Sequence, residues 1–133
     1  MKKYKLLEFN QLGDERGHLV VIEGLRNIPF EIKRMFYIYG TKENVVRGQH
    51  ANKISRFVLI NLAGKCKIRV NDGSNEEIFE LNKPHQGIYL DRMVWKDMYD
   101  FSKDSVLLVL SDSYYLADEY IRNIDILKEN NRK

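Results

Sequence analysis

The segment Arg47-Gly48-Gln49-His50-Ala51-Asn52-Lys53 combines a histidine, an arginine and a lysine within seven residues. A neutral imidazole is a suitable general base near pH 7, because its unperturbed pKa lies close to that value. On a strand, His50 and Asn52 are two residues apart and are expected to share one face. Arg47 and Lys53 could bind phosphate oxygens or stabilise an enolate. The segment predicts proton transfer on a small anionic ligand; the alternative is an edge strand with solvated charges.

A metal site built around His50 is not expected. Open metal sites take three or four protein ligands, mostly His, Cys, Asp or Glu. The neighbour two positions on is Asn52, whose amide is a poor ligand for transition metals, and cationic Lys53 and Arg56 follow it. Residues 88–111 contain no histidine that could complete a ligand set. The sequence therefore predicts neither a metal nor a cofactor.

The elements that must position these side chains read as short strands. Alternating or β-branched runs predict strands over residues 4–10, 18–23, 32–39, 45–52, 56–62, 65–70, 76–81, 88–90, 93–95 and 105–111. Residues 12–17 read as a turn, and short helical turns are expected after residue 112. Aromatic residues on both faces of 32–39 predict a strand covered on both sides. This pattern indicates an all-β protein, an antiparallel jelly-roll barrel with a short helical C-terminal segment, in one domain spanning residues 1–133.

Composition narrows the class of protein. The 133 residues are 44% hydrophobic and 31% charged, with a net charge of +3, and the basic residues are interspersed with acidic ones. This argues against a nucleic-acid partner, and no apolar run approaches the roughly 20 residues needed to span a membrane. Cys66 is the single cysteine, so no internal disulfide can form and Cys66 reads as a strand residue. With no recognisable signal peptide, a cytoplasmic protein is expected.

The central segment resembles the Arg-Gly-x-His-Ala-His-Lys signature of the nucleotide-sugar 3,4-ketoisomerases. These are cupin-fold enzymes that act on dTDP-4-keto-6-deoxyglucose. The similarity runs in order along nearly the whole chain. It covers Asp14–Gly17 with Leu19–Glu23, Ile28–Arg34, Asp72-Gly73, Pro84–Tyr89, Val94-Trp95, Asp100–Ser102, Tyr114-Tyr115 and Asp118–Arg122.

The resemblance implies a metal-independent isomerase with a cupin-like barrel. Such an enzyme moves the carbonyl of the dTDP-linked hexose from C4 to C3 through an enediol, and His50 would be the general base. The products of this family feed aminotransferases that make 3-amino-3,6-dideoxyhexoses for bacterial surface polysaccharides, such as the O antigen of lipopolysaccharide. Members are typically homodimers that bind the dTDP portion with basic and aromatic side chains.

The residue types and the resemblance together suggest a set of substrate-binding residues. They are Arg16, His18, Arg34, Tyr37, Tyr39, Arg47, Lys53, Trp95 and Lys96. Lys96, next to Trp95, could reach the sugar and help decide which face of C4 is reprotonated. Trp95 reads either as core packing or as a platform for the thymine base. A buried Arg34 needs an anionic partner, either a pyrophosphate or a carboxylate such as Asp14.

The chain departs from the signature at Asn52, where the family has a second histidine. His50 could then serve both carbons, another group such as His18 or Tyr37 could replace the missing histidine, or activity could be impaired. Two other functions stay open: a non-catalytic nucleotide-sugar-binding cupin, and a 3,5-epimerase acting on the same substrate. The resemblance also leaves the gluco or galacto configuration at C4 of the product open.

Overall fold

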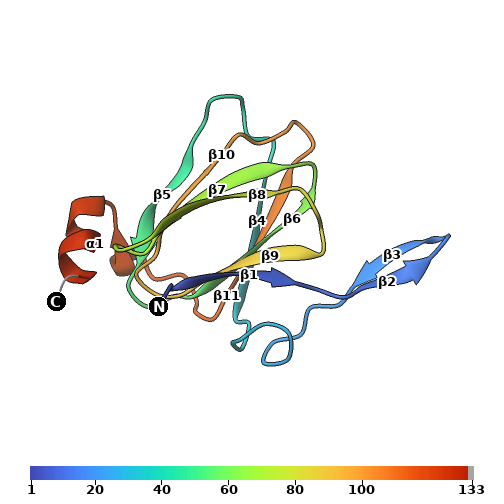
Figure 1. Ribbon diagram of the computed structural model, residues 1–133, viewed down its shortest axis with the longest axis horizontal. Coiled ribbons are helices and arrows are strands. Elements are labelled where there is room, and N and C mark those ends of the chain that lie inside the picture. Colours follow the sequence, from blue (N-terminus) through green and yellow to red (C-terminus); the bar gives the residue numbers. More distant parts are fainter. Residues whose placement is uncertain (132–133) are drawn as a thin grey trace.

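The computed structural model describes residues 1–131, so the last two residues of the expected domain lie outside the described residues. Two five-stranded sheets pack face to face (Figure 1), with strand orders β1-β9-β6-β11-β4 and β12-β5-β10-β7-β8. The first sheet holds β1 (Tyr4–Glu8), β4 (Arg34–Tyr39), β6 (Phe57–Ala63), β9 (Gln86–Leu90) and β11 (Val106–Ser111). The second holds β5 (Arg47–Asn52), β7 (Cys66–Asn71), β8 (Glu76–Leu81), β10 (Trp95–Tyr99) and β12 (Tyr120–Ile121).

The predicted fold class is confirmed. All pairings within the two sheets are antiparallel. The described part of the chain ends in a short helix, α1 (Ile124–Asn131), which comes after a 3-10 turn, η1 (Ala117–Glu119), and β12. The alternation in β7 explains why the sheets pack: Cys66, Ile68 and Val70 are buried between the layers, and the intervening side chains are partly exposed. No helix within residues 1–131 has the length and hydrophobicity needed to cross a bilayer.

The outer face of the first sheet is covered only in part. Ile28 and Phe30, from the connection between β3 and β4, pack against Val58, Ile60 and Leu110. This cover does not extend to β4, the edge strand, whose outward residues Met35, Tyr37 and Tyr39 are 59%, 58% and 71% exposed. The prediction that this strand is covered on both sides is therefore wrong within one chain. Alternating aromatic residues identify both faces as apolar, but not what lies over them.

The N-terminal region differs from the expectation in a second way. Instead of a turn followed by a long strand, it forms a hairpin of β2 (Gln11–Asp14) and β3 (Gly17–Val20). Gly13 adopts a positive φ of +131°, and a Cβ there would meet the carbonyl oxygen of Gly17, so glycine is required at this position. The hairpin projects away from the two sheets (Figure 1).

Strand β10 is the most consequential difference from the sequence reading. The expected strand ended at Trp95, whereas the observed one begins there and continues to Tyr99. It lies between β5 and β7 and pairs with both. The segment Lys96-Asp97-Met98 therefore belongs to the centre of a sheet, with Lys96 and Met98 buried on the inner face.

Candidate active site

A cavity of about 170 Å³ opens between the two sheets at the end where β4 faces β5 and β10. Its lining residues are Arg34, Phe36 and Ile38 of β4, Arg47, Gly48 and His50 of β5, Phe57 of β6, Lys96 and Met98 of β10, and Tyr120 of β12. The cavity brings together four of the residues implied by the resemblance: Arg34, Arg47, His50 and Lys96. We take it as the candidate active site.

A bulge in β5 shapes this cavity. Opposite β10, Lys96 pairs with His50 and Asp97 pairs with Gly48, so Gln49 is an extra residue on β5. Gly48 and Gln49 adopt φ angles of 82° and 58°, and a Cβ on Gly48 would lie 2.9 Å from the carbonyl oxygen of Lys96. Glycine at position 48 therefore permits the bulge, which accounts for its place in the central segment.

The bulge also fixes the tautomer of His50. The His50 Nδ1 atom lies 3.0 Å from the Gly48 carbonyl oxygen, which can only accept a hydrogen bond. Nδ1 therefore carries the proton in the neutral ring, and Nε2 has the free lone pair. Tyr120 packs against the imidazole at 82°, with ring centroids 4.7 Å apart. Burial, together with the nearby Lys96 cation, lowers the pKa of His50 to about 4. The imidazole is thus neutral at pH 7 and has the protonation state of a general base.

Lys96 lies opposite His50 on the same face of the second sheet. Its side chain is buried, and its Nζ lies 3.1 Å from Asn52 Oδ1 and 4.3 Å from the centre of the Phe57 ring. Burial lowers the pKa of Lys96 to about 7, and Arg34 acts in the same direction while Glu119 opposes it. His50, Asn52 and Lys96 therefore form one contiguous polar group inside the sandwich.

Glu119 lies behind this group and is buried. Its carboxylate accepts hydrogen bonds from the Ile54 amide at 3.1 Å, the Ser55 amide at 2.8 Å and the Ser55 hydroxyl at 2.6 Å. Burial alone would raise the pKa of the carboxyl, but these bonds outweigh it and hold the pKa below its usual value. The amide of Asn52 also favours the charged carboxylate, although its Nδ2 does not reach hydrogen-bonding geometry.

Replacing Glu119 by Gln is expected to destabilise the fold by about 1–3 kcal/mol, because an amide nitrogen would then face buried N–H and O–H donors. The stabilisation by the carboxylate is present above the pKa of an unfolded Glu and is lost as pH falls through the lower folded value. Urea unfolding should therefore show a larger difference at pH 7 than at pH 3. Asp118→Asn, at the exposed neighbouring position, is the matched control. An equal loss in both variants would contradict this role.

Arg34 has no carboxylate partner within the described residues. Its guanidinium lies 5.7 Å from the Phe36 ring centre and 5.9 Å from that of Phe57, and its buried Nε has no hydrogen-bond partner. The alternative that Asp14 pairs with it is wrong, because Asp14 lies on the projecting hairpin and binds Arg16 at 2.7 Å. A partly buried cation with an unused, buried donor at a cavity wall favours an anionic ligand.

The structure places the other implied ligand contacts elsewhere. Tyr37 and Tyr39 lie on the outer face of β4, stacked on each other at 6.0 Å between ring centres. Trp95 packs with Ala51, Ile121 and Leu127 on the outer side of the second sheet, which confirms the packing interpretation of this residue. Lys53 lines a separate cavity, of about 280 Å³. Arg16 and His18 lie on the hairpin, so none of these residues reaches the candidate site within one chain.

Sequence reasoning missed several residues of the site. Phe36, Phe57, Met98 and Tyr120 line the cavity, and Glu119 lies behind Asn52. The contact of Tyr120 with His50 depends on β12 pairing with β5, where Tyr120 is opposite Asn52. No local pattern around residue 120 predicts this long-range pairing. Over residues 1–131, no group of three or more His, Cys, Asp and Glu side chains is arranged to hold a metal ion.

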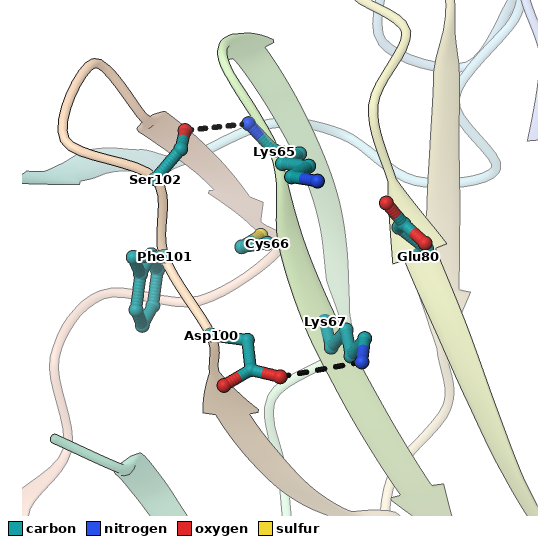
Figure 2. A pocket seen from close by; sticks show the side chains of 7 residues that line it. All are labelled: Lys65, Cys66, Lys67, Glu80, Asp100, Phe101 and Ser102. Carbon is teal, nitrogen blue, oxygen red and sulfur yellow. Dashed lines mark hydrogen bonds and ion pairs between the residues drawn. The ribbon is translucent and has the colours of Figure 1, made fainter. Parts of the chain in front are cut away.

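A larger cavity, of about 380 Å³, lies at the β6–β7 turn and holds none of the predicted site residues (Figure 2). Lys67 there is paired with Asp100 at 3.2 Å, so part of its charge is already neutralised. Cys66 is buried behind it, and burial raises the pKa of its thiol to about 12. A thiol with that pKa is inert as a nucleophile near pH 7, as expected for a structural strand residue.

The chain is similar to proteins with named activities. A family model described as "FdtA: WxcM-like, C-terminal" matches residues 2–132. TDP-4-oxo-6-deoxy-alpha-D-glucose-3,4-oxoisomerase from Aneurinibacillus thermoaerophilus is 42% identical over 125 residues, which cover 94% of this chain and 90% of that protein. A His-to-Asn mutant of the 3,4-ketoisomerase QdtA from Thermoanaerobacterium thermosaccharolyticum, solved with TDP-4-keto-6-deoxyglucose, has a TM-score of 0.93 and 41% identity over 98% of this chain and 94% of that one. WlaRA, a TDP-fucose-3,4-ketoisomerase from Campylobacter jejuni, has a TM-score of 0.92 and 42% identity, covering 97% and 96% of the two chains.

Proposed function

This chain belongs to the FdtA family, and from that premise we propose that it is a TDP-sugar 3,4-ketoisomerase that moves the carbonyl of TDP-4-keto-6-deoxyglucose from C4 to C3. The reaction is an enolisation: a base removes the proton on C3, an enediol forms, and a proton returns at C4. Relatives at 41–42% identity carry ketoisomerase names, which favours this reaction over a 3,5-epimerase or a non-catalytic binder.

The observation that carries the proposal is the state of His50. Its Nδ1 proton is held by the Gly48 carbonyl, its Nε2 lone pair is free, and its low pKa keeps it neutral at pH 7. A neutral imidazole in a cavity beside a buried cation is the arrangement that enolisation needs. The imidazole accepts the carbon-bound proton, and the cation stabilises the charge that develops on O4.

Arg34 and Arg47 support binding of the TDP portion. Both line the cavity, and Arg34 has the unused Nε donor described above. The cavity is smaller than the roughly 300 Å³ of the smallest pockets that enclose drug-sized ligands, so it suits the sugar ring alone. The diphosphate would then lie beside the two arginines. We propose these two arginines as the diphosphate ligands, and we propose no metal or other cofactor.

We further propose that the active form is a homodimer. Leu12 and Leu19 face each other across the hairpin and are 50% and 58% exposed, and an isolated two-stranded hairpin is only marginally stable in water. A second copy of the chain would cover these leucines. If Arg16 and His18 contact the substrate, as the resemblance implies, they must do so in the cavity of the partner, because the hairpin points away from its own.

Mixing two inactive variants tests this arrangement. In a heterodimer of His50→Asn with Arg16→Ala, one cavity combines an intact His50 with an intact hairpin from the partner. Unfolding and refolding the two variants together should therefore restore part of the wild-type activity, whereas each variant refolded alone stays impaired. If the mixture gains no activity although sedimentation shows that a dimer has formed, the hairpin does not contribute to the active site of the partner subunit.

We place the enzyme in the biosynthesis of 3-amino-3,6-dideoxyhexoses for a bacterial surface polysaccharide, such as the O antigen of lipopolysaccharide. A 3-keto sugar carries the carbonyl that an aminotransferase needs in order to install the 3-amino group. We also propose a cytoplasmic location, since the single cysteine is a free buried thiol, in keeping with a reducing compartment.

The direct test follows the carbonyl carbon by ¹³C NMR after TDP-4-keto-6-deoxyglucose is added to the purified chain. The proposal predicts that the carbonyl signal moves from C4 to C3, with the coupling constants giving the configuration at C4. A non-catalytic binder would retain TDP affinity, measured by calorimetry, without any product. A 3,5-epimerase would leave the carbonyl at C4 and exchange the protons on C3 and C5. Either of the last two results would overturn the proposed reaction.

A further inference from the structure

Lys96 is the one amine that lines the cavity, within the part of the chain that the structure describes. It is directly opposite His50 across the β5–β10 pair, so the two side chains project from the same face of the sheet. A sugar ring in the cavity would contact both. Lys96 is therefore placed to react with the sugar, as His50 is, and not only to pack against the cavity wall.

The contacts of the amine leave it free to gain and lose a proton. Its Nζ donates one hydrogen bond, to Asn52 Oδ1 at 3.1 Å, and lies over the Phe57 ring. None of the ion pairs among residues 1–131 includes Lys96. The Asn52 carbonyl can accept a hydrogen bond from an ammonium group or from a neutral amine, so it orients Lys96 in both of its charge states.

We propose that Lys96 is the second proton-transfer group of the isomerase, and that it carries the oxygen-bound proton between O4 and O3 while His50 carries the carbon-bound proton between C3 and C4. Asn52 is then a positioning residue that holds the amine. This inference rests on the proposed function. It also gives a physical role to the residue that departs from the signature of the family.

The proton transfers balance over one turnover. His50 Nε2 takes the proton from C3, a C3–C4 double bond forms, and O4 takes a proton from the Lys96 ammonium group. The enediol then loses its O3 proton to the neutral Lys96 amine, the C3 carbonyl forms, and C4 takes a proton from the His50 imidazolium. Both residues return to their starting states, so no external acid or base is consumed.

The charges around Lys96 support both halves of this cycle. His50 faces it from β5, Arg34 from β4 and Glu119 from η1, and the Tyr120 phenol of β12 lines the same cavity. Burial and Arg34 bring the pKa of Lys96 down to about 7 in spite of Glu119, whereas His50 has a pKa of about 4. Between these values the imidazole is a base and the amine is an acid, which are the states in which the cycle starts.

Asparagine fits position 52 better than a charged ligand of the amine would. A carboxylate there would hold Lys96 in its ammonium form and oppose its second step. An imidazolium there would place a cation beside the amine. The Asn52 amide does neither. Its Nδ2 group has no hydrogen-bond partner of its own, but it favours the charged form of the Glu119 carboxylate.

Three variants test the assignment by pH profile. In the wild type, kcat/KM should rise with pH through about 4 as His50 loses its proton, and fall above about 7 as Lys96 loses its own. Lys96→Met should lower kcat by about 10²–10⁴-fold and remove the alkaline limb. Lys96→Arg keeps the charge but cannot release a proton. This variant should therefore still bind TDP, but its kcat should be as low as that of Lys96→Met. Asn52→Asp should shift the alkaline limb to higher pH, which a merely structural asparagine would not do.

Lys67→Met, on the neighbouring strand β7, is the matched control and should keep its kcat, because Lys67 is half-exposed, pairs with Asp100 and lies outside the candidate site (Figure 2). TDP affinity and a cooperative melt confirm that each variant is folded. If the wild type isomerises but Lys96→Met keeps kcat within tenfold, or keeps the alkaline limb, the role of Lys96 is disproved and the proposed function stands. If the wild type itself makes no 3-keto product, the proposed function fails first.

Discussion

His50→Gln should lower kcat of the isomerisation by about 10²–10⁴-fold, the range expected for loss of a general base. Glutamine keeps a polar side chain of similar reach but cannot accept and return a proton. Because the proposed diphosphate ligands Arg34 and Arg47 remain in the cavity, affinity for TDP should change little. Steady-state assays with TDP-4-keto-6-deoxyglucose and calorimetry with TDP measure the two quantities separately.

His85→Gln is the matched control for this variant. His85 lies in the turn before β9 and lines no part of the candidate cavity, so the same substitution there should leave kcat unchanged. If His50→Gln instead raised KM at constant kcat, His50 would be a binding group. The base would then have to be sought elsewhere, with Tyr120 as the nearest ring.

Lys96→Met should stabilise the protein while it removes activity. Methionine fills the same buried space without the cost of desolvating a cation. The pKa of Lys96 is about 7 in the folded chain against 10.5 for an ordinary lysine, so the unfolded chain binds more protons between these values. Wild-type stability therefore rises with pH across this window, and the lysine costs most below about pH 7. The stability gained in Lys96→Met should be about 2 kcal/mol larger at pH 6 than at pH 9.

Urea unfolding at the two pH values measures this difference. The exposed Lys67→Met control should change the free energy of unfolding by no more than about 1 kcal/mol at either pH, since its ion pair with Asp100 is exposed to solvent. A Lys96→Met variant that is less stable than the wild type at pH 6 would show that the amine contributes favourably to the fold. Its burial would then be structural rather than functional.

The sequence predicted the architecture well because that prediction rests on local patterns. The alternation in β7 and the turn at Asn71–Ser74 are readable from neighbouring residues alone. The pairing of His50 with Asn52 on one face needed only the period of a strand. The shared face of His50 and Asn52 is confirmed by Lys96, which lies opposite His50 and donates a hydrogen bond to Asn52.

Two misreadings limited the prediction of the site. The segment Lys96-Asp97-Met98 is too polar to read as a strand, yet it lies between two others in a sheet. Only tertiary burial turns Lys96 from an ordinary surface cation into a buried amine. The β2–β3 hairpin was read as a turn, because Gly13 and Gly17 signal a chain reversal without giving its position. The exact point of reversal decides that Arg16 lies at the tip of the hairpin.

Other site residues depend on contacts distant in sequence. Glu119 reaches Ser55 across 64 positions, and Tyr120 reaches His50 only because β12 adds to the edge of β5. Tyr37 and Tyr39 show the converse case, since their resemblance-based role cannot be fulfilled within a single chain. Local pattern and family resemblance named the residue types of the site, but the pairing of strands decided which of them meet.

Isomerisation in deuterium oxide tests the central claim most directly. If His50 removes the C3 proton and returns one to C4, its imidazolium exchanges its proton with solvent between the two steps. Mass spectrometry and ¹H NMR of the 3-keto product should then find deuterium at C4 and protium at C5. A chain that binds TDP but gives no 3-keto product and no exchange at C3 or C4 would contradict the account, as would deuterium at C5 with the carbonyl still at C4.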